Sequence, residues 1–259
     1  MRTLGILAAA VILGLAGCAS SRAAESSRRV RLGLAEQLAK QGQWKEAYGA
    51  ADAVAREDPG NAQARLLRGR ALRMSGAVAE AEDGLRELVR REPGNAAAHS
   101  ELALVYEQSR RPEDALEHHR EAQRLAPGEP RFRNNLAFAL LVRGRAKEAI
   151  PLFEEALRAA SADPRFRNNL GFALAAAGDF AGAARQFELA GSQAEARNNL
   201  GFAYELSGNL SQAFELYIQA VRLDPSGGRS RANLEHAAHQ LGRAVPPDLV
   251  DPQPSNGGT

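Results

Sequence analysis

The chain has 259 residues, and its 33 Lys and Arg against 31 Asp and Glu give a formal net charge of +2. This balance argues against a nucleic-acid-binding protein, which needs a clustered basic surface. Only 5% of the residues are aromatic while Ala and Leu are abundant, and that composition favours helices over strands. We therefore expect an all-α protein with a charged, water-compatible surface.

Residues 1–17 have the pattern of a targeting segment rather than of a folded element. Arg2 precedes an apolar run from Leu4 to Leu15, which is too short for a bilayer span of roughly 20 residues. The run ends in Leu15-Ala16-Gly17-Cys18, which closely resembles the lipobox of bacterial lipoproteins. This resemblance implies a signal peptide cleaved before Cys18 and a covalent lipid on that residue. The alternative is an ordinary signal peptide in which Cys18 is only a small residue.

The residues after the lipobox bear on localisation. Cys18 is the only cysteine, so its acylation would leave no thiol for a disulfide. Ala19 and Ser20 follow it, and by resemblance to Gram-negative lipoproteins the lack of Asp at the second position argues against retention in the inner membrane. We expect an outer-membrane anchor facing the periplasm, with residues 18–27 as the lipidated cysteine and a short polar tether.

A repeat fills the middle of the chain. Six alanines recur along the chain, the first four intervals being 34 residues and the last 30. They are Ala47, Ala81, Ala115, Ala149, Ala183 and Ala213. Twelve residues before each alanine stands another Ala or Gly, preceded by Leu in every unit except the second, which has Arg68. Small residues at these two positions allow two helices to approach closely. Each unit therefore predicts a helical hairpin with a tight turn.

This pattern strongly resembles the tetratricopeptide repeat over residues 28–241. The resemblance implies an all-α solenoid, a right-handed superhelix of helix-turn-helix hairpins. We place its repeats at 28–61, 62–95, 96–129, 130–163, 164–193 and 194–227. A seventh first-helix pattern at 229–241 predicts a C-terminal capping helix, so the solenoid would span 28–243. Residues 244–259 are rich in Pro, Gly and polar side chains, and we expect them to be disordered.

The last three repeats share the motif R-N-N-L-[AG]-F-A, whose second asparagine precedes the packing leucine. This position is occupied by Asn135, Asn169, Asn199 and, in the cap helix, Asn233. Because successive helical residues are turned by ~100°, these amides would line the inner wall of the superhelix. A carboxamide can bond both the N–H and the C=O of an extended peptide. The arrangement resembles the asparagine ladder of superhelical tetratricopeptide domains that bind peptides in this way.

Neighbouring positions extend this candidate site. Phe138, Phe172 and Phe202 lie three residues after the asparagines and would form apolar pockets on the same wall. Arg131 and Arg165 lie four residues before them and would pair with an acidic side chain or a carboxylate. The alternative is that the asparagines are repeat consensus and the phenylalanines inter-repeat core.

A second set of arginines occupies a position where this repeat often has an aromatic residue. We expect their stems to cover apolar surface, a packing role rather than a ligand contact. The set is Arg31, Arg65, Arg133, Arg167, Arg197 and Arg231.

No strong catalytic constellation appears in the sequence. His236 and His239 share one helix without a third ligand, and the adjacent His118 and His119 point in different directions. There is no Gly-rich phosphate loop and no G-x-S-x-G motif. We predict a protein-interaction scaffold that is not an enzyme, with no metal and no cofactor other than the lipid on Cys18.

The lipobox, the short tether, the six units and the shared motif together resemble the tetratricopeptide lipoproteins of tight-adherence (Flp-type) pilus assembly, the TadD group, most specifically over 130–221. The resemblance implies an accessory or pilotin-like protein with a protein or peptide partner, such as a secretin or pilus component. It implies membrane attachment through lipid, and neither nucleic acid nor a small-molecule substrate. The alternatives are an adaptor for cell-wall or envelope machinery and a type IV pilus pilotin.

Overall fold

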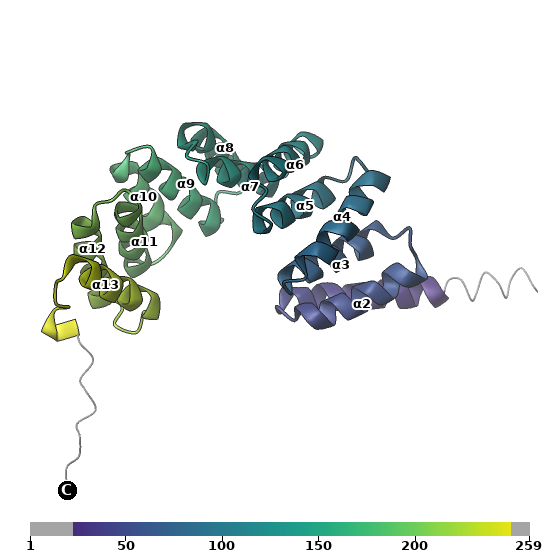
Figure 1. Cartoon of the computed structure of the whole chain (residues 1–259), viewed down its shortest axis with the longest axis horizontal. Coiled ribbons are helices and arrows are strands. Elements are labelled where there is room, and N and C mark those ends of the chain that lie inside the picture. The colour runs from purple at the N-terminus through teal and green to yellow at the C-terminus, as the bar shows by residue number, and fades with distance from the viewer. Residues whose placement is uncertain (1–22, 250–259) are drawn as a thin grey trace, which may run out of the picture. The chain divides into compact units, whose positions relative to one another are not determined.

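A computed structural model describes residues 23–249 of the chain (Figure 1). The predictions for the signal peptide and for Cys18 lie outside this range. All regular secondary structure between residues 23 and 249 is helical, which confirms the all-α prediction. None of the helices in this range is long and apolar enough to cross a membrane.

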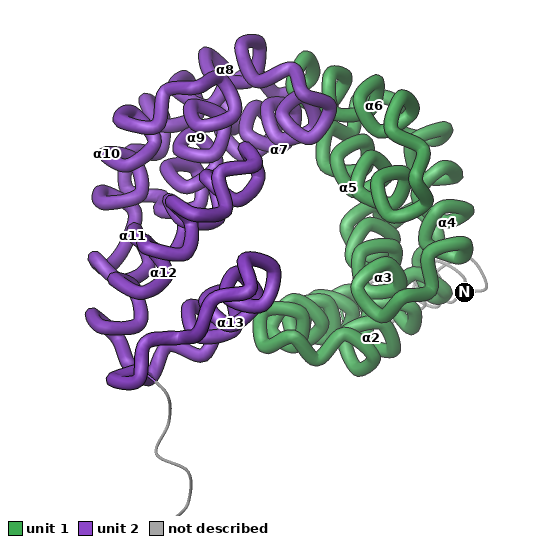
Figure 2. Tube along the Cα trace, turned by 60° about the vertical axis from the view of Figure 1, so that its left-hand side comes forward, with its two compact units in different colours: residues 1–125 green, residues 126–259 purple. Residues whose placement is uncertain are grey.

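The helices form two compact units, Met1–Leu125 and Ala126–Thr259, coloured separately in Figure 2. In the first unit, residues 23–40 are helical. They are followed by α2 (Trp44–Glu57), α3 (Ala62–Met74), α4 (Val78–Arg91), α5 (Ala96–Gln108) and α6 (Pro112–Leu125). The second unit contains α7 (Pro130–Leu141), α8 (Ala146–Ala159), α9 (Pro164–Ala176), α10 (Phe180–Ala190), α11 (Gln193–Leu206), α12 (Leu210–Leu223), α13 (Gly228–Leu241) and the 3₁₀ helix η1 (Pro247–Leu249).

Consecutive helices pair as antiparallel hairpins, and within each unit every hairpin packs on the next. The described residues thus hold six hairpins and one additional helix, α13, as predicted. The turn inside a hairpin places one residue in the left-handed region, which suits glycine. Gly76 takes this conformation with φ 84° in the second hairpin. In the third hairpin Arg110 has φ 54°, the only non-glycine residue with positive φ in the described range.

Where the small residue of a first helix is glycine, it receives a large side chain from the second helix of the same hairpin. A Cβ added to Gly171 on α9 would lie 2.5 Å from Cε1 of Phe187 on α10. A Cβ added to Gly201 on α11 would lie 2.7 Å from Cε1 of Tyr217 on α12. Both large residues stand one turn after a fully buried alanine of the repeat. This explains why Ala or Gly recurs at the small position, because a larger residue has no room there.

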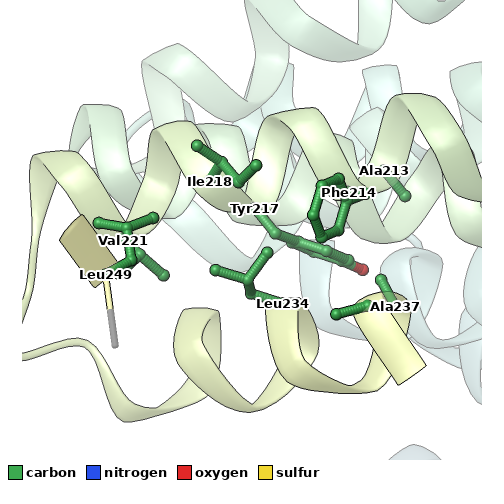
Figure 3. Packing of buried hydrophobic residues seen from close by; sticks show 9 residues of the cluster. Ala213, Phe214, Tyr217, Ile218, Val221, Leu234, Ala237 and Leu249 are labelled. Atoms are coloured by element: carbon green, nitrogen blue, oxygen red, sulfur yellow. The ribbon is translucent and has the colours of Figure 1, made fainter. Parts of the chain in front are cut away.

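The C-terminal end of the second unit is closed by α13 and η1. Figure 3 shows Tyr217 and Val221 of α12 packed against Leu234 of α13 and against Leu249. The phenol of Tyr217 donates a hydrogen bond of 2.6 Å to the Glu205 carboxylate. The cap helix therefore covers the apolar face that the last hairpin would otherwise expose to water.

Two boundary predictions are wrong. We expected disorder from residue 244, yet residues 244–249 dock on the cap: Leu249 is buried, and the Arg231 guanidinium donates a 2.6 Å hydrogen bond to its carbonyl oxygen. One apolar side chain with a carbonyl anchor holds this Pro-rich segment in place. We also expected a tether up to residue 27, yet residues 23–27 are helical and exposed. Ala23 and Ala24 favour helix, and Glu25 pairs with Arg29 one turn later.

Candidate functional site

The four ladder asparagines lie on first helices of the second unit. Asn135, Asn169, Asn199 and Asn233 belong to α7, α9, α11 and α13, and each is half-buried. The helices are spatial neighbours, because α9 packs against both α7 and α11, and α11 packs against α13. The structure therefore brings the predicted row together within this unit.

The asparagine doublets form hydrogen bonds between adjacent repeats. In each case the ladder asparagine of one first helix, or of the cap helix, donates to the first asparagine of the preceding doublet. The bonds run from Asn169 Nδ2 to Asn134 Oδ1 at 3.0 Å, from Asn199 Nδ2 to Asn168 Oδ1 at 3.1 Å, and from Asn233 Nδ2 to Asn198 Oδ1 at 2.9 Å. A contact of 3.4 Å from Asn198 Nδ2 to Asn199 Oδ1 connects two of these bonds. The doubling of asparagine in the motif thus has a structural reason that sequence reasoning missed.

This network changes what the ladder can offer a ligand. A carboxamide has two donor hydrogens and one acceptor oxygen, and each inter-repeat bond uses one donor of the ladder residue. Asn169 and Asn233 keep a second N–H and an acceptor oxygen for another partner, while Asn199 also accepts from Asn198. The amides are therefore held in fixed orientations by bonds between repeats.

The three phenylalanines lie one helical turn after the ladder asparagines on α7, α9 and α11. Phe138 and Phe202 are 42% and 40% exposed, which is high for large apolar side chains. The ring of Phe172 stands edge-on to Phe202, with 6.0 Å between centroids, and also packs on buried Phe187 at 4.9 Å. The structure thus brings Phe172 and Phe202 together as one surface.

The apolar row continues one helical turn further. Val142, the C-cap residue of α7, and Leu206 on α11 are exposed four residues after Phe138 and Phe202. Sequence reasoning missed both residues, although the i, i+4 spacing from the phenylalanines was the available signal. Together these residues form what we call the apolar row: Phe138, Val142, Phe172, Phe202 and Leu206.

The two arginines predicted to meet a ligand carboxylate have partners in their own chain. Arg165 pairs with Asp163 at 2.7 Å, and this guanidinium holds the pKa of the Asp163 carboxyl below its usual range. Arg131 lies 3.4 Å from the Glu129 carboxylate and 4.6 Å above the ring of Phe132. Both arginines are exposed, so an acidic ligand would have to compete with these local pairs.

Several of the packing arginines tie the start of a first helix to the turn before it. Arg133, Arg167 and Arg231 each donate to the carbonyl oxygen six residues earlier, on Pro127 at 2.6 Å, Ser161 at 2.8 Å and Pro225 at 3.2 Å. These bonds satisfy carbonyls in the turns between successive repeats. For these three residues the structure supports a packing role.

A cavity of about 460 Å³ lies among the starts of α9, α11 and α13. Its lining includes Asn168, Asn198 and Asn199, so it opens beside the amide network. Glu195 and Arg229 add charge to the wall. Hydrogen bonds from the backbone and hydroxyl of Ser192 lower the pKa of Glu195 and keep it ionised. Sequence reasoning did not find this cavity, because residues of two inter-repeat turns and of the starts of α9, α11 and α13 form it together.

Hairpins linked through their first helices by side-chain amides, with an apolar row beside them, define a helical-repeat scaffold. Family comparisons agree with this class. One model described as tetratricopeptide repeat matches residues 38–105 and 106–168, and a second matches 194–226. The chain belongs to the tetratricopeptide-repeat family.

Solved structures share the fold at low sequence identity. PilW, described as a widely conserved type IV pilus biogenesis factor, has a TM-score of 0.67 at 17% identity over 80% of this chain and 98% of its own. PilF of Pseudomonas aeruginosa has a TM-score of 0.63 at 18% identity over 82% and 98%. YrrB, described as having an unusual peptide-binding site, has a TM-score of 0.54 at 19% identity over 72% and 98%. No curated protein sequence matches the chain.

Proposed function

We propose that this chain is a non-enzymatic adaptor that holds a segment of another polypeptide against the first helices of its second unit. The observation that carries the proposal is the apolar row next to the amide network. On α11, Asn199, Phe202 and Leu206 follow one another at i, i+3 and i+7, which puts them on one helix face. Asn135 and Phe138 on α7 and its C-cap residue Val142 repeat this order.

Such a surface suits an extended segment with apolar side chains. Covering the exposed part of one phenylalanine contributes about 1 kcal/mol, and several such rings contribute together. The remaining amide groups can bond the partner's main chain without demanding a particular sequence. Because hydrogen bonds between repeats already orient the amides, binding loses little side-chain entropy.

We further propose that the adaptor is anchored by lipid on Cys18 in the outer membrane, facing the periplasm. Support comes from Leu15-Ala16-Gly17-Cys18 and from Ala19-Ser20 behind it. Two or three acyl chains give a durable anchor, whereas one gives marginal binding. A Cys18→Ser variant should accumulate as unprocessed precursor and take up no labelled palmitate. Continued labelling would remove the lipid anchor from the proposal.

The partner we favour is a secretin or another component of tight-adherence pilus assembly. The motif R-N-N-L-[AG]-F-A behind a lipobox supports this assignment. The second candidate is a role in type IV pilus assembly, as a pilotin, and it is favoured by the shared fold of PilW and PilF. An adaptor for cell-wall or envelope machinery is the remaining alternative.

Site-specific photocrosslinking on membranes tests both the surface and the partner. A photoreactive phenylalanine analogue is placed at Phe202, and as a matched control at Gln219, which is exposed on α12. We expect a secretin or pilus subunit to be captured from position 202 and not from 219. Capture of murein synthases or hydrolases instead would favour the envelope adaptor. Equal capture from both positions, or capture from 219 alone, would reject the proposed surface.

A further inference from the structure

Two histidines in the first unit face each other across a hairpin. Nδ1 of His99 on α5 lies 2.8 Å from Nδ1 of His118 on α6, and the ring centroids are 5.0 Å apart. His99 is only 7% exposed, and His118 is half-buried. The sequence predicts no metal site here, because the only histidine next to His118 in the chain is His119, which points in a different direction. The fold instead pairs it with a residue 19 positions earlier.

The neighbours of His99 determine which of its nitrogens carries the hydrogen. Its Nε2 lies 3.2 Å from the carbonyl oxygen of Pro93. A carbonyl oxygen can only accept, so Nε2 of His99 is the donor. In the tautomer that carries its single hydrogen on Nε2, the Nδ1 lone pair of His99 faces His118. The short contact between the two Nδ1 atoms therefore needs either a proton on His118 Nδ1 or a cation between the rings.

We propose that His99 and His118 chelate one divalent transition-metal ion, such as Zn²⁺ or Cu²⁺, through their Nδ1 atoms. With metal–nitrogen distances of 2.0–2.1 Å, two ligands at a right angle stand ~2.9 Å apart and two at a tetrahedral angle ~3.3 Å apart. The observed separation is within a small ring rotation of this range. Imidazole nitrogen suits Zn²⁺ and Cu²⁺, and a histidine ligand usually donates its other N–H to a carbonyl or carboxylate, as His99 does to Pro93.

The surroundings leave room for the remaining ligands. His118 borders two cavities, of about 510 Å³ and about 520 Å³. Their charged lining is balanced, with four carboxylates and four guanidiniums: Asp83, Glu87, Glu117, Glu121, Arg86, Arg90, Arg120 and Arg124. Among the described residues no cluster of three or more His, Cys, Asp or Glu is arranged for a metal. The protein thus supplies two ligands, and water supplies the others.

Metal binding requires His118 to carry its hydrogen on Nε2 instead of Nδ1. In a neutral pair this is a change of tautomer, with no net release of a proton. The bound ion would then join α5 to α6 inside the third hairpin, beside Tyr106, whose ring centroid is 5.4 Å from that of His118. His99 and His118 belong to the first unit, whereas the proposed polypeptide-binding surface belongs to the second.

Calorimetric titration of the full chain with ZnCl₂, without a polyhistidine tag, tests the site. We expect one ion per chain. Both His118→Gln and His99→Gln should weaken zinc binding by at least ~10- to 100-fold. Loss of a residue that only hydrogen-bonds a metal ligand already has an effect of this size. The matched control is His239→Gln, an exposed histidine on α13, which should bind as the unaltered chain does. No saturable binding, or equal binding by the His118 variant, would overturn the proposal.

A second measurement avoids the loss of folding that replacement of buried His99 can cause. Electron paramagnetic resonance of the unaltered chain with one equivalent of Cu²⁺ should show two coordinating nitrogens, and one of them should vanish in His118→Gln. A spectrum that is unchanged by His118→Gln but altered by His239→Gln would place the ion elsewhere and contradict the site.

Discussion

Nδ2 of Asn199 on α11 donates a 3.1 Å hydrogen bond to Oδ1 of Asn168 on α9, which joins the first helices of two successive hairpins. The same bond recurs from Asn233 to Asn198 and from Asn169 to Asn134. Amide pairs of this kind hold adjacent repeats in a fixed orientation and, by doing so, form one wall of the cavity beside α9, α11 and α13. Scaffold and candidate binding surface therefore share the same side chains.

The coupling between these amides is measurable. Asn168→Ala and Asn199→Ala should each lower the free energy of unfolding. The loss in the double variant should be smaller than the sum of the two single losses by ~1 kcal/mol, because the variants share one hydrogen bond that can be lost only once. Urea denaturation followed by circular dichroism gives the four free energies of the cycle. Exposed Gln219→Ala on α12 is a control that should change little. Strict additivity would mean that the bond contributes nothing.

The close approach of paired helices gives a second test. Gly171→Ala places a Cβ 2.5 Å from Phe187, and this overpacking should destabilise the protein by ~1 kcal/mol or more. Gly33→Ala is the matched control, because that helical glycine has no atom within 4 Å of an added Cβ. It should stabilise the protein by ~1 kcal/mol through helix propensity alone. Equal thermal shifts for the two variants would contradict the packing described for this position.

The turn of the third hairpin is strained at Arg110. An L residue in the left-handed conformation costs ~1–2 kcal/mol, whereas glycine costs 0.5–1 kcal/mol of entropy. Arg110→Gly should therefore raise the free energy of unfolding by ~0.5–1 kcal/mol. Gly76→Ala, at the same place in the second hairpin with φ 84°, should lower it. A destabilised Arg110→Gly variant would show that Arg110 makes a stabilising contact that outweighs its strain.

The capping box at the start of α11 predicts a pH dependence. Hydrogen bonds from Ser192 lower the pKa of Glu195 in the folded protein, so its stabilising contribution is fully present above the unfolded pKa of about 4.3. The contribution is lost as the pH falls through the lower folded value. Glu195→Gln should reduce the loss of stability between pH 5 and pH 3, as followed by thermal denaturation. An identical acid profile in the variant would exclude Glu195 as a source of that loss.

The repeat made the hairpins predictable, because the small residues of both helices recur at a fixed spacing that only close helix packing requires. The alignment of Asn135, Asn169, Asn199 and Asn233 followed from the same spacing. The pairing of each ladder amide with the first asparagine of the previous repeat did not, since it depends on how one hairpin is rotated on the next. The exposure of the phenylalanines also depends on packing between hairpins, which covers part of Phe172 and leaves Phe138 and Phe202 exposed.

The boundaries of the repeat array were harder to predict, because amino-acid composition does not show whether one side chain docks on the neighbouring helices. Leu249 inserts into the cap and Glu25 pairs with Arg29, so both terminal segments are more ordered than their polar character suggested. His99 stands where the other five repeats and the cap helix have arginine, whereas the position of His118 has a residue other than histidine in every other repeat. The break in the arginine set marks position 99, but no periodic signal indicates His118 as its partner.

The central claim is that the apolar row holds a partner polypeptide. Its most direct test is the affinity of the captured partner segment for the variant Phe138→Ser/Phe202→Ser, measured by calorimetry beside the control Leu223→Ser, an equally exposed apolar residue on α12. We predict that the double variant binds at least ~10-fold more weakly, about 1.4 kcal/mol, with an unchanged circular dichroism spectrum and an unaffected control. Undiminished affinity in the folded double variant would contradict the account.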